Sequence, residues 1–147
     1  MTAAVLKAFE TFKLRACDAW MLDYPELMDE LRCQALAFPS YALPTVDPVV
    51  LCGVVHRLGE GEVWMVTGEG FERRVREVLP MQRALIETMY SVLGLHRLQL
   101  TVDSRRRDAA IWAKHLGFKF EHGPMKRKGA RAIDMDLYVY TQGEIEA

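Results

Sequence analysis

The clearest pattern of hydrophobic and polar positions lies between residues 98 and 118. Apolar and polar residues alternate from Leu98 to Asp103, which is typical of a strand with one buried face. Asp103 or Ser104 can then act as a helix N-cap, because their side-chain oxygens accept hydrogen bonds from the free amides of a first turn. Gly117 can end this helix in a left-handed conformation, and Phe118 begins a further strand. The predicted helix has one apolar face, made of Ala109, Trp112, Ala113 and Leu116.

The pattern is less definite in the first part of the chain. Alternating apolar residues between 12 and 16 suit a strand, whereas apolar residues at 5, 6 and 9 suit a helix. We favour a strand over residues 5–17 that ends near Cys17. A helix is predicted from Asp23 to Pro39, with Pro25 at a first helical position. Residues 39–48 hold three prolines and are predicted to form a connecting loop.

A hairpin and a long helix are predicted in the middle of the chain. Residues 49–55 form a continuous apolar run, as expected for a strand inside a sheet, and a turn at 57–61 leads to a return strand at 62–67. Helical periodicity then extends to Leu93 and ends at Gly94. Pro80 interrupts this pattern, which predicts a kink or a short first helix before the main one.

The end of the chain adds a basic loop at residues 122–131, an alternating strand at 133–140 and an acidic tail at 142–147, which we expect to be frayed. The element order predicts a single α/β domain over residues 1–147. Its central sheet is expected to be mixed and partly antiparallel, with helices on both faces.

Composition narrows the class of protein. The 147 residues carry a net charge of −1 and are 50% hydrophobic, so the total charge argues against a general nucleic-acid binder. Three cysteines without a CxxC motif argue against a disulfide framework and favour a reducing compartment, with the thiols serving as small core residues. The four histidines show no metal-ligand spacing, and no metal site is expected. No segment has the roughly 20 apolar residues that span a bilayer, and the charged N-terminus lacks a signal-peptide core, so we expect a cytoplasmic protein.

The strongest candidate for a binding site is the junction at residues 66–74. Gly68 and Gly70 would let backbone amides turn toward a ligand at the start of the long helix. Arg73 and Arg74 lie in the first turn, where cations are unfavourable unless an anion binds there. A solvent-facing basic patch after an ordinary glycine turn explains these residues about equally well. The segment is not a P-loop, because no Lys-Ser/Thr pair follows.

The element order and the segment VDSRRRDAAIWAKHLGFKFE resemble the GNAT superfamily of acetyl-CoA-dependent N-acetyltransferases. Ala109 and the ending Leu116-Gly117-Phe118 fit the family pattern, and a narrower likeness is to short phage-encoded acetyltransferase-like proteins. The resemblance implies that acetyl-CoA binds at the junction, with its pantetheine arm along the strand and its pyrophosphate at the helix start. The residues implied are Met65, Val66, Thr67, Gly68, Gly70, Phe71, Arg73 and Arg74.

This chain departs from the family at three points. The glycines come early and the segment from 71 to 78 has none. Ala113 stands where a tyrosine often protonates the leaving thiolate, and Arg106 stands where an asparagine is usual and could contact a CoA phosphate. Glu60 and Glu62 lie on or beside the strand that often carries the general base, although either could simply belong to the polar face of that strand.

Two functions follow from these observations. The first is an N-acetyltransferase that moves an acetyl group to an amine of a small molecule or a protein. We expect no membrane partner for it, and it could form a homodimer. The second is a non-catalytic GNAT-fold interaction or structural protein, for example a phage virion or host-binding component; in a phage setting the location would be the host cytoplasm or the virion. Nucleic-acid binding through residues 105–107 ranks third, since three arginines without interleaved aromatic residues are weak evidence.

Overall fold

The computed structural model describes residues 2–15, 17–128 and 131–141. Six strands form one mixed sheet in the order β1-β2-β3-β4-β6-β5. β3 and β4 are parallel, whereas β1–β2, β4–β6 and β5–β6 are antiparallel. The predicted class of fold, an α/β protein with a mixed and partly antiparallel sheet, is confirmed. The chain folds as two compact units, residues 1–56 with 63–82 and residues 57–62 with 83–147.

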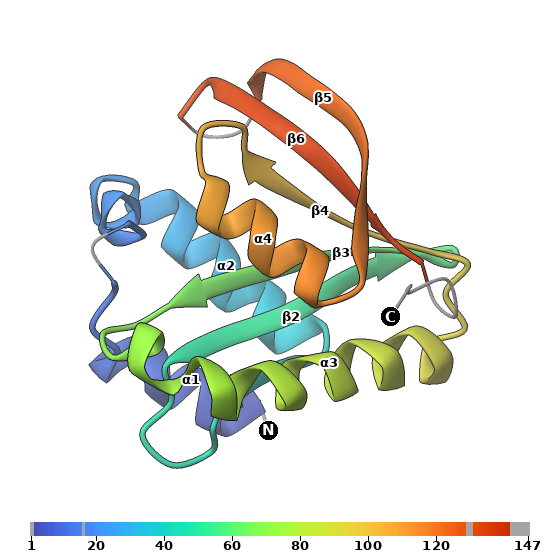
Figure 1. The fold of residues 1–147 in the computed structure, drawn as a ribbon. Coiled ribbons are helices and arrows are strands. Elements are labelled where there is room, and N and C mark those ends of the chain that lie inside the picture. The colour runs from blue at the N-terminus through green and yellow to red at the C-terminus, as the bar shows by residue number, and fades with distance from the viewer. Residues whose placement is uncertain (1, 16, 129–130, 142–147) are drawn as a thin grey trace. The chain divides into compact units, whose positions relative to one another are not determined.

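The first unit begins with two helices and a short edge strand. α1 (Thr2–Thr11) contacts both α2 (Pro25–Ala37) and β1 (Ser40–Leu43), and a 3-10 turn, η1 (Ala19–Asp23), precedes α2 (Figure 1). A shared core joins them to the sheet, built on the buried residues Val5, Ala8, Met21, Leu31, Ala35, Ala42, Leu51 and Val66. Pro25 occupies the start of α2 as predicted, where its missing N–H costs nothing.

Two predictions for this region are wrong. The first part of the strand predicted over residues 5–17 belongs instead to the helix α1, which ends at Thr11, because Val5 and Ala8 lie one turn apart and are both buried. Near residue 14, where apolar and polar residues alternate, the described residues form an isolated antiparallel bridge between Leu14 and Gly68 in place of a strand. The loop predicted at 39–48 contains β1, since residues 40–43 pair with β2 although prolines flank them on both sides.

The hairpin and the long helix were predicted correctly in outline. β2 (Val50–Arg57) and β3 (Glu60–Thr67) are neighbours in the sheet, joined by Leu58 and Gly59 with positive φ angles of 53° and 81°, as in a type I′ turn. A short helix does precede the main one, but it is η2 (Phe71–Arg74), and α3 (Val75–Val92) runs through Pro80. Pro80 is exposed, so water can bond the carbonyl that its missing N–H leaves free.

The second unit contains the segment that the sequence predicts best. β4 (Arg97–Asp103), α4 (Arg107–His115) and β5 (Phe118–Lys128) follow one another as predicted, and Gly117 has a left-handed φ of 98°. The predicted N-cap is wrong, because Arg106 caps α4 and makes no side-chain capping bond. Asp103 instead accepts the backbone N–H of Arg105 at 3.0 Å, and Ser104 donates to Asp136 at 2.7 Å.

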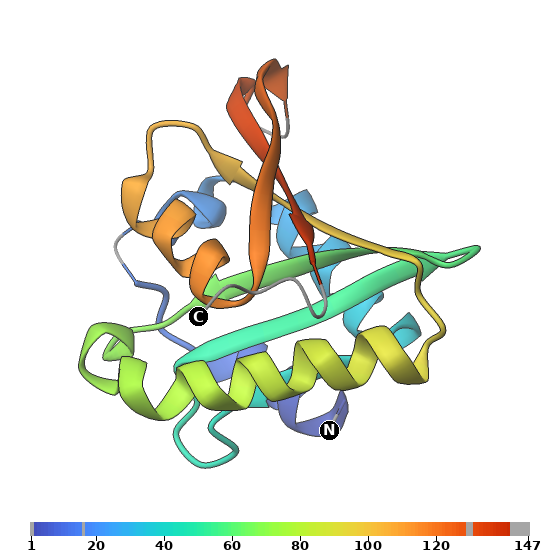
Figure 2. The ribbon, with the colours of Figure 1, turned by 45° about the vertical axis from the view of Figure 1, so that its right-hand side comes forward.

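The last two strands form a long hairpin, shown in orange and red in Figure 2. β6 (Ile133–Tyr140) matches its prediction, whereas the basic loop predicted at 122–131 is a strand as far as Lys128. β5 remains paired with β6 along its length, but the pairing contains several register shifts. These irregularities allow the polar second half of β5 to stay hydrogen-bonded to β6. Tyr138 and Tyr140 are the buried residues of β6. The predicted frayed tail at 142–147 lies outside the described residues.

None of the three cysteines forms a disulfide bond. Cys52 is a core residue, and burial raises the pKa of its thiol to about 12, whereas Cys33 is exposed. Within the described residues, no helix has the length and apolar character needed to cross a membrane. No three His, Cys, Asp or Glu side chains of this part of the chain are grouped so that they could hold a metal ion.

Candidate functional site

The candidate junction lies at the end of β3, within the first unit. β3 ends at Thr67, a short link follows, and Gly70 begins the helical segment with a left-handed φ of 89°. η2 then continues directly into α3. The polypeptide therefore turns sharply from strand to helix at the position that the sequence predicted.

Each glycine of the junction has a local structural reason. A Cβ atom on Gly68 would lie 2.5 Å from Cζ of Phe12, closer than carbon atoms pack. Gly70 requires its positive φ, which side chains disfavour. Close approach of a ligand is therefore not needed to explain either glycine.

Gly68→Ala is expected to destabilise the protein by about 1–3 kcal/mol, because the new methyl group forces the Phe12 ring out of its packed position. Urea unfolding measures the change. Phe12→Leu should shorten the opposing side chain, so the loss caused by Gly68→Ala should shrink in that background. An equal loss in both backgrounds would show that the contact with Phe12 is not the cause.

Most of the junction amides that were expected to face a ligand already have partners. The N–H groups of Thr67, Gly68 and Glu69 donate to Asp18 Oδ2 at 2.9 Å, to the carbonyl of Val49 at 2.8 Å and to the carbonyl of Lys13 at 2.8 Å. The N–H groups of Phe71 and Arg73 donate within the turn itself. Any anion bound here would therefore be held mainly by side chains in this conformation.

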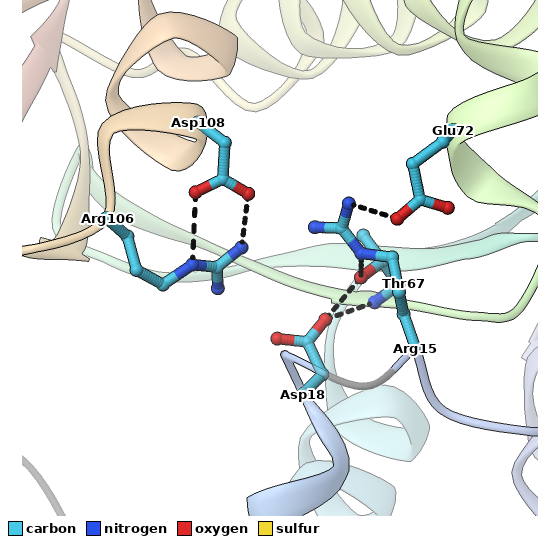
Figure 3. Close-up of polar contacts among 6 residues, drawn as sticks. All are labelled: Arg15, Asp18, Thr67, Glu72, Arg106 and Asp108. Atoms are coloured by element: carbon cyan, nitrogen blue, oxygen red, sulfur yellow. Dashed lines mark hydrogen bonds and ion pairs between the residues drawn. The ribbon is translucent and has the colours of Figure 1, made fainter.

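Arg15 reaches the junction from the segment between α1 and η1 (Figure 3). Its Nε donates to Thr67 Oγ1 and its Nη1 to Glu72 Oε1, both at 3.0 Å, and the guanidinium lies 4.7 Å from the centre of the Phe71 ring. The Thr67 hydroxyl in turn donates to Asp18 Oδ2 in a short hydrogen bond. These contacts tie the start of the chain to the end of β3 and to η2.

Neither Arg15 nor Asp18 was expected at this site from the sequence. Arg15 was assigned to the polar face of a predicted strand, and Asp18 followed it without any motif. Their partners Thr67 and Glu72 lie 49 to 57 residues further along the chain. No local pattern could have indicated this cluster.

The two arginines that were predicted at the junction differ in their surroundings. Arg74 forms an ion pair with Glu77 at 3.0 Å and also donates to the carbonyl of Asp47. Arg73 is exposed, and its charge helps to lower the pKa of Glu72. Arg73 is thus the more accessible cation.

The expected general bases lie at the start of β3, which belongs to the second unit. Glu60 and Glu62 are both exposed and occupy positions that pair with Arg97 and Gln99 of the parallel strand β4. The charge of Glu60 raises the pKa of Arg97, although the largest cause is the hydrogen bond between Arg97 and Glu121. Glu60 therefore already has a cation nearby.

Two positions at which this chain departs from the GNAT pattern, Arg106 and Ala113, lie on or beside α4. Arg106 forms a two-pronged pair with Asp108, with Nη2–Oδ2 at 3.0 Å and Nε–Oδ1 at 3.4 Å (Figure 3). Ala113 is 2% exposed and carries no proton donor. The helix can present a cation, but position 113 cannot supply an acid.

A pocket of about 260 Å³ lies in the first unit. Its walls are mostly apolar, and the ion pair between Asp29 and Arg32 supplies its charged groups. Such a pocket suits an apolar group of modest size. It is lined by Phe12, Leu14, Leu22, Pro25, Met28, Asp29, Arg32, Leu51 and Val66.

Comparison with known proteins identifies the fold. No protein-family model and no curated protein matches the sequence. Among solved structures, a GNAT-family acetyltransferase from Bacillus anthracis is similar over 94% of this chain and 91% of its own, with 14% identity and a TM-score of 0.67. RimJ of Mycobacterium smegmatis, in complex with CoA-disulfide, is similar over 99% and 78%, with 16% identity and a TM-score of 0.61.

A third similar structure is a chimera of the spermidine N-acetyltransferase SpeG from Vibrio cholerae with hSSAT. It is similar over 84% of this chain and 78% of its own, with 18% identity and a TM-score of 0.55. The chain therefore has the fold of the GNAT acetyltransferases. At these identities the likeness establishes the fold and leaves the chemistry to the residues of the site.

Proposed function

We propose that this protein is an acyl-CoA-dependent N-acetyltransferase that transfers an acetyl group from acetyl-CoA to an amine of a small molecule or a protein. The observation that carries the proposal is a cationic strand-to-helix junction at the end of β3 in a GNAT fold. RimJ was solved with CoA-disulfide, and SpeG is a spermidine N-acetyltransferase. The bound CoA species of RimJ and the spermidine acetylation of SpeG are both consistent with the proposal.

The surroundings of the Glu72 carboxylate suggest that the junction suits a phosphate group. The pKa of its carboxyl lies below the usual value, because its own backbone N–H, the hydrogen bond from Arg15 and the charges of Arg15 and Arg73 all favour the ionised form. The part of this stabilisation that comes from the cations Arg15 and Arg73 would also act on a phosphate. We assign Arg73 and Arg74 to the cofactor phosphates, and Arg106 remains a proposed phosphate contact.

The strand edge suits a pantetheine arm at Met65. Alternate residues of a strand direct their N–H and C=O groups to the same edge. The amide and carbonyl of Thr67 bond Asp18 and Arg15, whereas the amide of Gly68 bonds Val49 on the opposite edge. Met65 therefore shares the edge of Thr67 without being part of that bonded segment, and we place the pantetheine contact there, with Val66 as its neighbour.

Bound acetyl-CoA would supply an acetyl thioester with an electrophilic carbonyl carbon. Glu62 would accept the proton of the attacking amine, directly or through one water molecule. Glu60 is the weaker candidate because its charge already acts on the nearby Arg97, which is itself hydrogen-bonded to Glu121. Ala113 cannot protonate the departing thiolate, but a thiol has a pKa near 8.5, so its thiolate can leave without a dedicated acid.

Isothermal titration of the full chain with acetyl-CoA tests the cofactor assignment. Arg73→Ala combined with Arg74→Ala should weaken binding at least about tenfold, because each charge-assisted hydrogen bond to a phosphate contributes appreciably. Lys126→Ala with Lys128→Ala removes two exposed cations of β5 and controls for net charge. No binding by the wild type, or equal effects of the two double variants, would contradict the assignment.

A non-catalytic GNAT-fold protein, such as a phage virion or host-binding component, is the second candidate. The absence of a proton donor at Ala113 and the internal bonding of the junction amides favour it. A CoA-release assay with a broad panel of amines separates the two candidates. Turnover with any amine supports the enzyme, and CoA binding without turnover supports the second candidate.

A further inference from the structure

The pair formed by Arg15 and Glu72 is unequal in exposure. The Arg15 side chain is only 15% exposed, whereas that of Glu72 is 66% exposed. Nη1 of Arg15 contacts Oε1 of Glu72 at 3.0 Å. A largely desolvated cation thus faces a carboxylate that reaches it from the solvent side.

Arg15 is held rigidly by groups other than Glu72. Its Nε donates to the Thr67 hydroxyl, its backbone N–H donates to the Thr67 carbonyl at 2.9 Å, and its guanidinium stacks over Phe71. Asp18 fixes Thr67 in turn through the Thr67 amide and hydroxyl. The guanidinium is therefore already positioned, and a ligand would lose little conformational entropy in binding it.

Glu72 by contrast reaches this cation from the solvent side, and its own backbone N–H also stabilises its charge. Water screens the exposed carboxylate, and its side chain loses conformational freedom in the pair, so the pair contributes little to stability. A phosphate competes well for the same guanidinium, since it carries more charge and can accept two parallel hydrogen bonds from the fork. Arg73 lies close enough for its charge to favour an anion at this position.

We propose that Arg15 is a phosphate-binding residue and that Glu72 is an internal counter-ion, which the phosphate replaces. The identity of the phosphate as the diphosphate of an acyl-CoA rests on the proposed function. The anion site itself rests on the contacts of Arg15, Thr67, Phe71 and Glu72.

Titration with CoA tests the exchange. Glu72→Gln removes the competing charge and should tighten CoA binding by about fivefold, the range expected for an exposed ion pair. Arg15→Gln should weaken CoA binding by about 10- to 100-fold, and Arg15→Lys should lie between, since it keeps the charge but lacks the fork. Tighter binding by Glu72→Gln is the decisive result, because damage to the fold could only weaken binding.

Asp29→Asn is the matched control. Like Glu72, Asp29 is an exposed carboxylate that accepts a hydrogen bond from the Nη1 atom of an arginine at 3.0 Å. The arginine is Arg32, on the same helix α2. The change in net charge is the same as in Glu72→Gln. CoA affinity should stay at the wild-type value in Asp29→Asn, and an equal gain in both variants would overturn the proposal.

Inorganic pyrophosphate separates this proposal from the proposed function. If the wild type binds CoA but Glu72→Gln and Arg15→Gln leave its affinity unchanged, the exchange is wrong and the proposed function stands. If the wild type does not bind CoA, the proposed function fails, and pyrophosphate then decides the anion site. Tighter pyrophosphate binding by Glu72→Gln than by Asp29→Asn supports that site, and equal or undetectable binding by both variants overturns it.

Discussion

Glu62→Gln is expected to lower the kcat of acetyl transfer by about 10²- to 10⁴-fold, the usual contribution of a general base. Glu62 is exposed on β3, and glutamine keeps its shape while losing the ability to accept the proton of the amine. Steady-state kinetics with the best amine of the panel measures this change in kcat.

Glu60→Gln is the control for this experiment. It removes the same charge two residues earlier on the same strand, and Glu60 is exposed as well. We expect kcat to change less than about threefold, and neither variant should alter stability by more than about 0.5 kcal/mol, as is usual for surface positions. Equal losses in the two variants, or an unchanged kcat in Glu62→Gln, would remove Glu62 as the base.

Phe118→Ala is expected to lower the free energy of unfolding by about 3–5 kcal/mol, because it deletes a large side chain from a packed core. Phe118 is 1% exposed and begins β5 directly after Gly117. Its ring lies 5.5 Å from that of Tyr140, which in turn lies 5.2 Å from Tyr90 of α3. Urea unfolding followed by circular dichroism measures the loss.

Phe120→Ala provides the comparison within the same strand. Phe120 lies two residues further on, is 53% exposed and has one edge-on ring contact with Tyr138. Its removal should cost about 0.5–1.5 kcal/mol, the value of an aromatic pair. A similar loss from both substitutions would show that Phe118 is not a core residue of the second unit.

Several elements could be predicted from the sequence because their causes are local. The unit from β4 to β5 depends on an alternating strand, a helical apolar face and a glycine that accepts a left-handed φ, and these features all lie within about twenty residues. α2 begins at Pro25 for the same kind of reason, and the β2–β3 hairpin follows from two apolar runs around a glycine turn. The start of the candidate site at Gly68 and Gly70 was found in this way too.

Other elements depend on partners that are distant in sequence. Residues 5–17 carry apolar positions that suit a helix at one end and a strand at the other, and we favoured the strand. Burial of Val5 and Ala8 in a core shared with α2 and the sheet selects a helix as far as Thr11. Residues 40–43 lie between two prolines, and residues 122–128 contain a proline and several charges, which predicts loops in both places. Backbone pairing with β2 and with β6 nevertheless makes both segments strands. Neighbouring strands supply hydrogen bonds that outweigh weak local preferences.

For this protein, the sequence by itself determined the order of most elements, the class of fold and the position of the strand-to-helix junction. Only the tertiary structure decided how that junction is built: Arg15 and Asp18 bond Thr67 and Glu72 across 49 to 57 residues, and Gly68 makes room for Phe12. Periodicity along a chain reports which face of an element is apolar, whereas contacts between distant side chains depend on how the folded chain brings them together.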